Sequence, residues 1–396
     1  MSNYLIVNTG SSSKKYALYT EGRELFKIYF EHENGDIAAT TKIGEESHKT
    51  VVSQAQYGSS LDYLLEVLLE TKVIADKSEI TAIGVRIVAP GNYFLGNKII
   101  DEKYIVKLQE AKQQAPLHLE PIISEIKKIQ SVLPGIPMAG ISDSAFHSDL
   151  SPQARLYNLP DGMATKFGIY RFGYHGISAQ SVVNKIKTLL GSMPPRTIIC
   201  HLGSGSSIHA VKDGKSFDTS MGFTPLEGVT MGTRIGNIDA GAVLYLLQKS
   251  GMSPTELENY FNTECGLLGL SGKTPDIREL IELEKSGNAG AKTALDAFIY
   301  SVRKYIGAYA AAMNGLDLLV FTATIGERSS IMRERICRGL AGLGIVIDSE
   351  QNDQTISRDG LIHKEKGSPV KAAVIVTDEM GQMAYETATL CDRATS

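Results

Sequence analysis

A short unit of strand, glycine- and serine-rich turn and second strand occurs in both halves of this chain. Near the N-terminus, the apolar run Tyr4–Asn8 leads through a turn into the alternating run Lys15–Tyr19. The pattern returns where Thr197–His201 leads through residues 202–207 into Ile208–Val211. Four residue pairs match, three at one constant offset and the last after a slip of one residue: Gly10 with Gly203, Ser13 with Ser206, Ala17 with Ala210, and Gly22 with Gly214. Such a duplication predicts two domains built on one plan, although two unrelated hairpins would give the same local pattern.

Helical stretches alternate with these strands, which predicts an α/β fold. The clearest of them cover residues 59–71, 181–190 and 289–313. A chain of 396 residues is too long for one ordinary hydrophobic core, so we expect two domains.

The C-terminal segment predicts how the two domains share the chain. Residues 371–376 form an apolar run typical of a buried strand, and Thr377 follows as the expected N-cap of a helix towards Leu390. We expect this helix to return to the first domain. The first domain then comprises residues 1–144 plus 379–396, and the second comprises residues 145–378.

Charge and cysteine content exclude several classes of protein. The 40 basic and 44 acidic residues are balanced, and no run of lysine or arginine forms a patch for nucleic acid. Four scattered cysteines fit a reducing compartment and form neither a disulfide framework nor a zinc motif. No signal peptide is visible, and polar residues interrupt the most apolar window, residues 305–325. We therefore expect a cytoplasmic protein that binds neither nucleic acid nor membrane.

The two glycine- and serine-rich turns are candidate phosphate cradles. Glycine allows consecutive backbone N–H groups to converge on an anion, and serine hydroxyls add further donors. Neither turn is a Walker A loop, and Gly203-x-Gly205 is followed by Ile208 where a dinucleotide fingerprint has its third glycine. Either turn alone would be interpreted as an ordinary hairpin turn, but two such turns at matching positions favour anion binding.

A third glycine-bearing turn, residues 322–328, follows the buried strand 318–321, and we expect a helix to begin at about Ser329. The N-terminus of a helix offers free N–H groups and a positive dipole to an anion. An ordinary joint between strand and helix would look the same.

Two arginines stand where a cation is unusual. Arg234 lies in the long glycine- and threonine-rich segment 218–239, which has too many apolar anchors to be disordered. Arg86 interrupts an otherwise apolar strand. A guanidinium group can donate two parallel hydrogen bonds to a phosphoryl group or a carboxylate. The alternative for Arg86 is an edge strand whose arginine faces water.

Asp143 and His175 are the other candidate catalytic residues. Asp143 ends an apolar strand, and His175 lies between aromatic residues and a glycine, where a histidine is often only a packing residue. The eight histidines show no spacing typical of metal ligands, which disfavours a zinc hydrolase.

Taken in order, these motifs resemble those of the acetate kinase family, within the superfamily of sugar kinases, Hsp70 and actin. The matching runs span nearly the whole chain: Asn8–Lys15, Ala115–His118, Asp143–His147, Tyr174–Gly176, His201–Gly205, Asp218–Gly222, Thr224–Gly228, Met231–Arg234, Gly266–Gly272, Lys304–Ala310, Phe321–Ala323 and Ile325–Glu327. The resemblance implies two duplicated domains of the ribonuclease H-like type with a cleft between them, the second of which binds nucleotide. It also implies a homodimer that transfers phosphoryl from ATP to acetate, with propionate as a further acceptor and Mg²⁺ or Mn²⁺ as cofactor.

The resemblance also implies a role for individual residues. The catalytic set is Arg86, Asp143, His175 and Arg234, in which the arginines hold the carboxylate and the phosphoryl group and His175 stabilises the transition state. The apolar acyl pocket is Val88, Leu117, Tyr174 and Pro225, and Arg86 also binds the substrate. The metal positions are Asn8 and Glu379. The nucleotide and phosphate contacts are Lys15, His201, Leu202, Gly203, Ser204, Gly205, Asp276, Ile277, Arg278, Thr324, Ile325, Gly326, Glu327 and Arg328.

The chain departs from the family pattern around these residues. The usual H-R-V-V-H-G-G is Val85–Gly91 without its two histidines, and Ser204, Asn237 and Arg328 replace asparagine, aspartate and asparagine. Thr324 replaces a glycine, so we expect it to resist a positive φ and to weaken ATP binding. These changes leave two alternatives open, an acyl kinase that uses pyrophosphate and a nucleotide sensor without turnover. The full set of Arg86, Asp143, His175 and Arg234 favours an enzyme, because a sensor does not need a carboxylate site.

Overall fold

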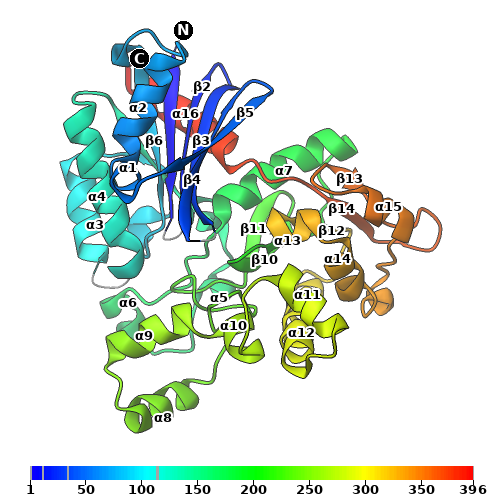
Figure 1. Cartoon of the computed structure of the whole chain (residues 1–396). Helices are drawn as coiled ribbons and strands as arrows, with labels where there is room; N and C mark the ends of the chain where they lie inside the picture. The colour runs from blue at the N-terminus through cyan, green and yellow to red at the C-terminus, as the bar shows by residue number, and fades with distance from the viewer. Residues whose placement is uncertain (1, 11–12, 34, 113–115, 396) are drawn as a thin grey trace. The chain divides into compact units, whose positions relative to one another are not determined.

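The computed structural model describes residues 2–10, 13–33, 35–112 and 116–395, with the backbone alone for 116–118 and 393–395. The chain divides into two compact units, residues 1–145 with 378–396, and residues 146–377 (Figure 1). No helix among the described residues is long and apolar enough to cross a membrane.

The first unit contains a mixed sheet with the strand order β5-β4-β3-β2-β1-β6-β8-β7. Its strands are β1 (Asn3–Thr9), β2 (Ser13–Thr20), β3 (Arg23–Glu33), β4 (Asp36–Ile43), β5 (Glu46–Val52), β6 (Ile80–Ile87), β7 (Lys98–Ile99) and β8 (Met138–Ser142). Strands β1, β6 and β8 run parallel, and the strands from β2 to β5 form an antiparallel meander.

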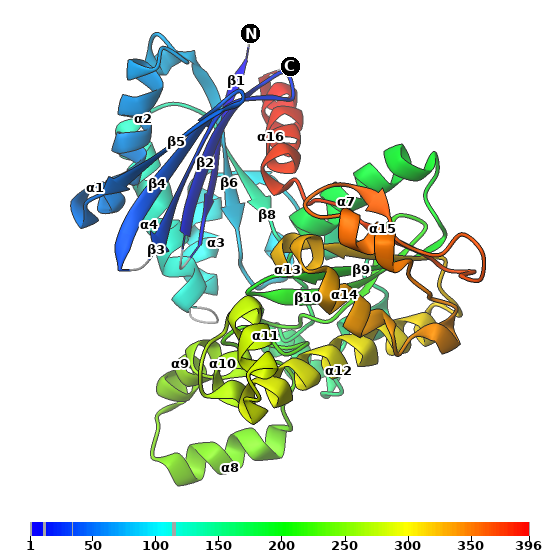
Figure 2. The ribbon, with the colours of Figure 1, turned by 45° about the vertical axis from the view of Figure 1, so that its right-hand side comes forward.

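Helices cover both faces of this sheet (Figure 2). They are α1 (Gln54–Gly58), α2 (Ser60–Glu70), α3 (Glu102–Ala111), α4 (Pro116–Val132) and α16 (Glu379–Thr395). Leu5 and Val7 of β1 pack with apolar residues of α2, α3 and α4, so these helices cover one face. Helix α16 contacts β1, β6 and β8 on the other face. A Cβ atom at Gly84 would lie 2.1 Å from Thr387 Oγ1 of α16, so glycine is needed for this close approach.

The second unit contains a sheet with the order β11-β10-β9-β12-β14-β13. Its strands are β9 (Arg196–Leu202), β10 (Ser206–Lys212), β11 (Lys215–Thr219), β12 (Leu318–Thr322), β13 (Gly360–Leu361) and β14 (Lys371–Val374). Its helices are α5 (Pro152–Arg155), α6 (Asp161–Phe167), α7 (Gly176–Leu190), α8 (Ala240–Ser250), α9 (Pro254–Thr263), α10 (Gly266–Ser271), α11 (Ile277–Lys285), α12 (Ala289–Ala312), α13 (Ala323–Arg328), α14 (Ser330–Cys337) and α15 (Ser349–Gln354).

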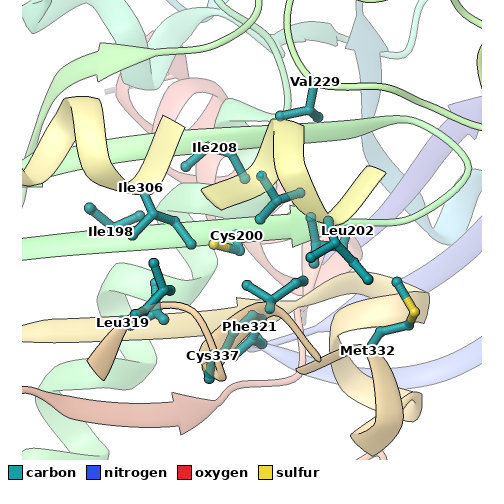
Figure 3. Packing of buried hydrophobic residues seen from close by; sticks show 14 of the residues in the cluster. Ile198, Cys200, Leu202, Ile208, Val229, Ile306, Leu319, Phe321, Met332 and Cys337 are labelled. Atoms are coloured by element: carbon teal, nitrogen blue, oxygen red, sulfur yellow. The ribbon is translucent and has the colours of Figure 1, made fainter. Parts of the chain in front are cut away.

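The main core of this unit lies on one face of the sheet (Figure 3). Ile198 and Cys200 of β9 pack there with Phe321 of β12 and with Ile306 of α12. On the opposite face, Ile199 packs with the apolar side of α7. Because adjacent strand residues point to opposite faces, the almost continuous apolar run of β9 fits a strand that is covered on both sides.

The two sheets share one plan, which confirms the predicted duplicated α/β fold. In each sheet three antiparallel strands continue into two parallel ones, β3-β2-β1-β6-β8 in the first and β11-β10-β9-β12-β14 in the second. The slip between the copies lies in the first turn. Asn8 pairs with Lys15, whereas His201 pairs with Ser207, which is one residue sooner after the turn. The expected constant offset for the second strands is therefore wrong by one residue.

Two expected helix starts are also corrected. Helix α16 begins at Glu379, and the Asp378 carboxylate accepts a hydrogen bond from the Gly381 N–H at 2.9 Å, so Asp378 rather than Thr377 is the N-cap. The Thr377 N–H donates to Glu327 instead. A helix does begin after Ser329, whose side chain caps α14, but residues 323–328 already form α13.

Candidate functional site

In the first unit, strand alternation places two polar side chains on the face of the sheet that α16 covers. Val85 and Ile87 belong to the core on the opposite face, so Arg86 between them points towards the α16 side. Asn8 follows the core residue Val7 on β1 and points the same way. Glu379 is the first residue of α16.

These residues form a hydrogen-bonded cluster with Asp143, which follows β8. Arg86 donates to both Asp143 carboxylate oxygens, from Nη2 at 2.9 Å and from Nε at 3.3 Å. Its Nη1 donates to Asn8 Oδ1 at 3.2 Å, and Asn8 Nδ2 donates to Glu379 Oε2 at 3.3 Å. The Asp143 side chain is 1% exposed and that of Arg86 18%. Four residues predicted from separate parts of the chain therefore meet.

The environment of Arg86 keeps it charged. Burial alone would lower the pKa of its guanidinium, but the charges of Asp143 and Glu379 raise that pKa above its usual value. Strand β6 lies between β1 and β8, so the alternative of an edge-strand arginine facing water is wrong.

Three other predicted residues lie in the first unit. Lys15 pairs with Asn8 across β1 and β2, which puts both side chains on one face. Val88 is half-buried against the core. Leu117 is the second residue of α4, and its side chain lies outside the described part of the structure, as do Ser11 and Ser12 of the first glycine- and serine-rich turn.

In the second unit, His175 occupies the N-cap position of α7 with φ +56°, a left-handed conformation that is uncommon for a residue other than glycine. Its Nδ1 lies 2.9 Å from Ser207 Oγ, and its ring stacks on that of His201 with 4.1 Å between centroids. The His201 ring is itself fixed by Ser178 Oγ, 2.8 Å from Nδ1. The His175 ring is therefore held by its neighbours on two sides.

The second glycine- and serine-rich turn lies beside His175. It closes through a hydrogen bond of 3.2 Å from Gly203 N to Gly205 O. Leu202 is buried in the core and Ser204 is exposed. A Cβ atom at Gly205 would lie 3.4 Å from Arg234 Nη1 and 3.5 Å from His175 Nε2. The missing side chain thus leaves a space flanked by a cation and an imidazole, which suits an approaching phosphate.

Arg234 lies in the irregular segment between β11 and α8, as predicted. Its Nη1 donates to the carbonyl of Pro225 at 3.3 Å, so a residue predicted to be catalytic contacts one predicted for the acyl pocket. Tyr174 is 1% exposed, and its hydroxyl donates to the carbonyl of Phe223 at 2.7 Å. That hydroxyl is therefore tied to the loop that carries Pro225 and Arg234.

One arginine of this loop network was not singled out in the sequence. Arg171 donates to the carbonyls of Thr219 and Met221, each at 3.3 Å, and to Glu227 Oε1 at 2.9 Å. Tyr157 also donates to the Glu227 carboxylate. Glu227 lies inside the matching run Thr224–Gly228, whereas Arg171 lies outside the matching runs. Their partnership is long-range and has no signal in spacing.

The predicted nucleotide residues of α11 lie at its start. Asp276 caps the helix by accepting from the Arg278 N–H at 2.8 Å, and it also pairs with the Arg278 guanidinium. Ile277 is buried beneath them. The Arg278 side chain is 89% exposed, and a shallow surface depression is lined by Asp276, Arg278 and Leu283.

Helix α13 contains the other predicted nucleotide segment, Thr324, Ile325, Gly326, Glu327 and Arg328. The positive φ in this turn belongs to Ala323, at +63°, and not to Thr324, which is an exposed helical residue. The expected backbone conflict at Thr324 is therefore wrong. Glu327 Oε1 accepts from Ala323 N at 2.8 Å and from Thr377 N at 3.0 Å. Its carboxylate therefore connects the start of α13 to the segment that follows β14.

Asn8 and Glu379 fit a magnesium site of the kind found in kinases. The Glu379 carboxylate and the Asn8 amide offer hard oxygen donors. The 3.3 Å contact between them joins Asn8 Nδ2 to Glu379 Oε2, while Asn8 Oδ1 accepts from Arg86. Among the described residues no group of three or more His, Cys, Asp or Glu side chains could hold a metal ion. A cation here would therefore take most of its ligands from phosphate oxygens and water, as Mg²⁺ does in phosphoryl-transfer sites.

Comparison with known proteins gives the same assignment over the whole chain. The profile of the acetokinase family matches residues 3–385. The chain belongs to the acetokinase family. It is 40% identical over 391 residues to the acetate kinases of Bacillus cytotoxicus and Bacillus subtilis, covering 98% of this chain and of each relative.

Solved structures of acetokinase relatives share the fold. The acetate kinase of Porphyromonas gingivalis superposes with a TM-score of 0.87 at 34% identity, covering 98% of this chain and 100% of that one. A propionate kinase from Francisella tularensis superposes with a TM-score of 0.90 at 34% identity and the same coverage. The chain is thus an enzyme of a family of phosphotransferases with a carboxyl group as acceptor.

Proposed function

We propose that this protein transfers the γ-phosphoryl group of ATP reversibly to acetate, giving acetyl phosphate and ADP, and accepts propionate as a second substrate. The observation that carries the proposal is the buried Arg86–Asp143 pair beside Asn8 and Glu379 in a chain of the acetokinase family. The names of the relatives support both substrates, since acetate and propionate kinases share this fold. The test is a hydroxamate assay for acyl phosphate with several acids and donors.

The proposed reaction needs positioned charge rather than a strong base. A carboxylate is already ionised at pH 7, so an acetate oxygen attacks the γ-phosphorus as the bond to the bridging oxygen of ADP breaks. Negative charge spreads over the phosphoryl oxygens in the transition state, and Arg86, Arg234 and His175 supply donors to them. Asp143 is engaged at both oxygens by Arg86, so its proposed role is to orient that guanidinium. A divalent cation held at Asn8 and Glu379 would neutralise further phosphate charge.

Tyr174 and Pro225 are the residues of the second unit that we assign to the acyl pocket. Tyr174→Phe should raise the KM for acetate roughly three- to tenfold, because the partly buried Phe223 carbonyl loses this hydrogen bond and the loop that carries Pro225 loosens. The KM for ATP should stay within about twofold of the wild-type value. Steady-state kinetics measure both, with Tyr170→Phe as the matched control, because the Tyr170 hydroxyl bonds to Thr165 Oγ1 at 3.1 Å in an exposed position. An unchanged KM for acetate in Tyr174→Phe would remove Tyr174 from the pocket.

The proposal includes a homodimer, and α8 is the face that supports it. None of the residues of α8 is buried, although most of them are apolar. Leu244 and Tyr245 are 60% and 61% exposed, and the first charged side chain of the helix is Lys249. Figures 1 and 2 both show α8 away from the sheet of the second unit. A helix whose exposed apolar side chains carry no charge until Lys249 in the last turn is typical of the core of an interface. A second copy of this chain is the simplest partner, because two-fold homodimers are the commonest oligomers.

The double variant Leu244→Glu/Tyr245→Glu should weaken the dimer by roughly 100-fold or more, since two central apolar contacts become charges. Sedimentation velocity over a range of protein concentrations measures this change. The control is Tyr385→Glu, which places a charge at a 65% exposed tyrosine of the first unit. A dimer that persists in the α8 variant would show that this face is not the interface.

A further inference from the structure

A buried row of histidines and hydroxyl groups extends from His175 through β10. Ser207 Oγ lies 2.9 Å from His175 Nδ1 and 2.7 Å from His209 Nε2. His209 Nδ1 in turn lies 3.1 Å from Thr219 Oγ1. Ser207 and His209 are two positions apart on β10, so both point to the same face while Ile208 between them enters the core. Ser207, His209 and Thr219 are all buried.

The ring of a second histidine packs against this row. His147 stacks on His209 with 5.2 Å between centroids. Its Nε2 lies 3.1 Å from the carbonyl of Tyr174, which can only accept, so that nitrogen carries a proton. Its Nδ1 lies 2.7 Å from Ser216 Oγ. The Tyr174–His175 peptide and the His209 ring are thus held by the same side chain.

His209 acts in this row as a neutral group. Burial, with His147 and His201 nearby, holds the pKa of its imidazole well below its usual value. A neutral imidazole carries one N–H, and a serine hydroxyl can donate one hydrogen bond while it accepts another. His175 Nδ1 therefore keeps a partner in both of its forms. When Nδ1 is bare, Ser207 donates to it and accepts from His209, and when Nδ1 is protonated, both bonds reverse.

We propose that His209 is a positioning residue for His175: through the Ser207 hydroxyl it fixes the His175 ring so that Nε2 faces the transferring phosphoryl group. The space beside Gly205 supports this direction, because a Cβ atom there would lie 3.5 Å from His175 Nε2 and 3.4 Å from Arg234 Nη1. Within the described part of the second unit, ionisable groups near the His175 ring include Arg234 at this space, His201 in the stack and His209 beyond Ser207. The inference rests on the proposed function, in which His175 acts on phosphate.

Two substitutions of His209 test the proposal as a matched pair. The glutamine amide reaches about as far as Nε2 and can keep the bond to Ser207, whereas the asparagine amide reaches only about as far as Nδ1. His209→Asn should lower kcat roughly tenfold with both KM values within about twofold, and His209→Gln should restore most of that loss. Ser207→Ala should lower kcat as much as His209→Asn, and the double variant should lose nothing more, because both changes break one connection. Wild-type turnover in His209→Asn, or losses that multiply in the double variant, would overturn the proposal.

A second readout does not depend on activity. In ¹⁵N spectra of the imidazole groups without substrate, His209→Asn should shift the His175 Nδ1 resonance, and His209→Gln should leave it near the wild-type position. Equal spectra for all three proteins would contradict the proposed connection. The two proposals can fail separately. If the wild-type protein makes no acetyl phosphate but His209→Asn still shifts the His175 Nδ1 resonance, the proposed function is refuted and the connection between His209 and His175 is upheld.

Discussion

Replacing Arg234 with alanine should lower kcat by roughly 10³-fold, because a cation positioned on a transferring phosphoryl group has effects of this size. A Cβ atom at Gly205 would lie 3.4 Å from Arg234 Nη1 and 3.5 Å from His175 Nε2, and the Arg234 guanidinium donates to the Pro225 carbonyl. Arg234→Lys should recover only part of the loss, since an ammonium group lacks the planar fork. Steady-state kinetics with ATP, acetate and Mg²⁺ measure the change, and Arg358→Ala, at an exposed arginine, is the control. Turnover near the wild-type rate in Arg234→Ala would end the proposed mechanism.

Replacing Arg86 with alanine should also lower kcat roughly 10³-fold, but here the fold should suffer as well. Asp143 is 1% exposed and would keep a buried charge without its main cation, an arrangement that typically costs several kcal/mol. The double variant Arg86→Ala/Asp143→Ala should therefore melt at a higher temperature than Arg86→Ala and remain as inactive. Thermal unfolding and kinetics on the same samples separate the two effects. A double variant that regains activity would show that Arg86 serves the fold alone.

The features that sequence predicts well here are those fixed by local pattern. The β1–β2 and β9–β10 hairpins follow from alternating apolar residues and glycine turns, and each expected strand lies where the sequence puts it. Arg86 stands out because a charge inside an apolar strand needs a partner, and Asp143 provides it. The roles of these residues remain predictions.

Other features depend on atoms that are distant in sequence. Both Thr377 and Asp378 have side chains suited to capping a helix. Asp378 is the cap, and the Thr377 hydroxyl instead donates to Ser178 Oγ at 2.8 Å, 199 residues earlier. The positive φ at Ala323 accompanies a hydrogen bond from its N–H to the Glu327 carboxylate. His209 looks like one more polar residue in a strand until Ser207 and Thr219 are placed around it. In each case a tertiary contact determines the local structure, and the spacing of residues along the chain does not predict that contact.

The geometry of α13 also changes the expectation for the donor. Thr324 has helical backbone and an exposed side chain, so the argument from positive φ against tight ATP binding no longer applies. Arg328, the other departure from the family pattern in this segment, is also exposed. The proposed nucleotide residues Gly203, Gly205 and Asp276 keep the family pattern.

The central claim is ATP-dependent phosphorylation of acetate, and one comparison of donors tests it most directly. Acetyl phosphate is trapped as its hydroxamate while the purified wild-type protein turns over acetate with Mg²⁺ and either ATP or pyrophosphate. We predict acetyl hydroxamate with ATP, at a kcat/KM clearly above that with pyrophosphate. A higher kcat/KM with pyrophosphate would contradict the ATP assignment, and binding of ATP without any product would make the protein a nucleotide sensor.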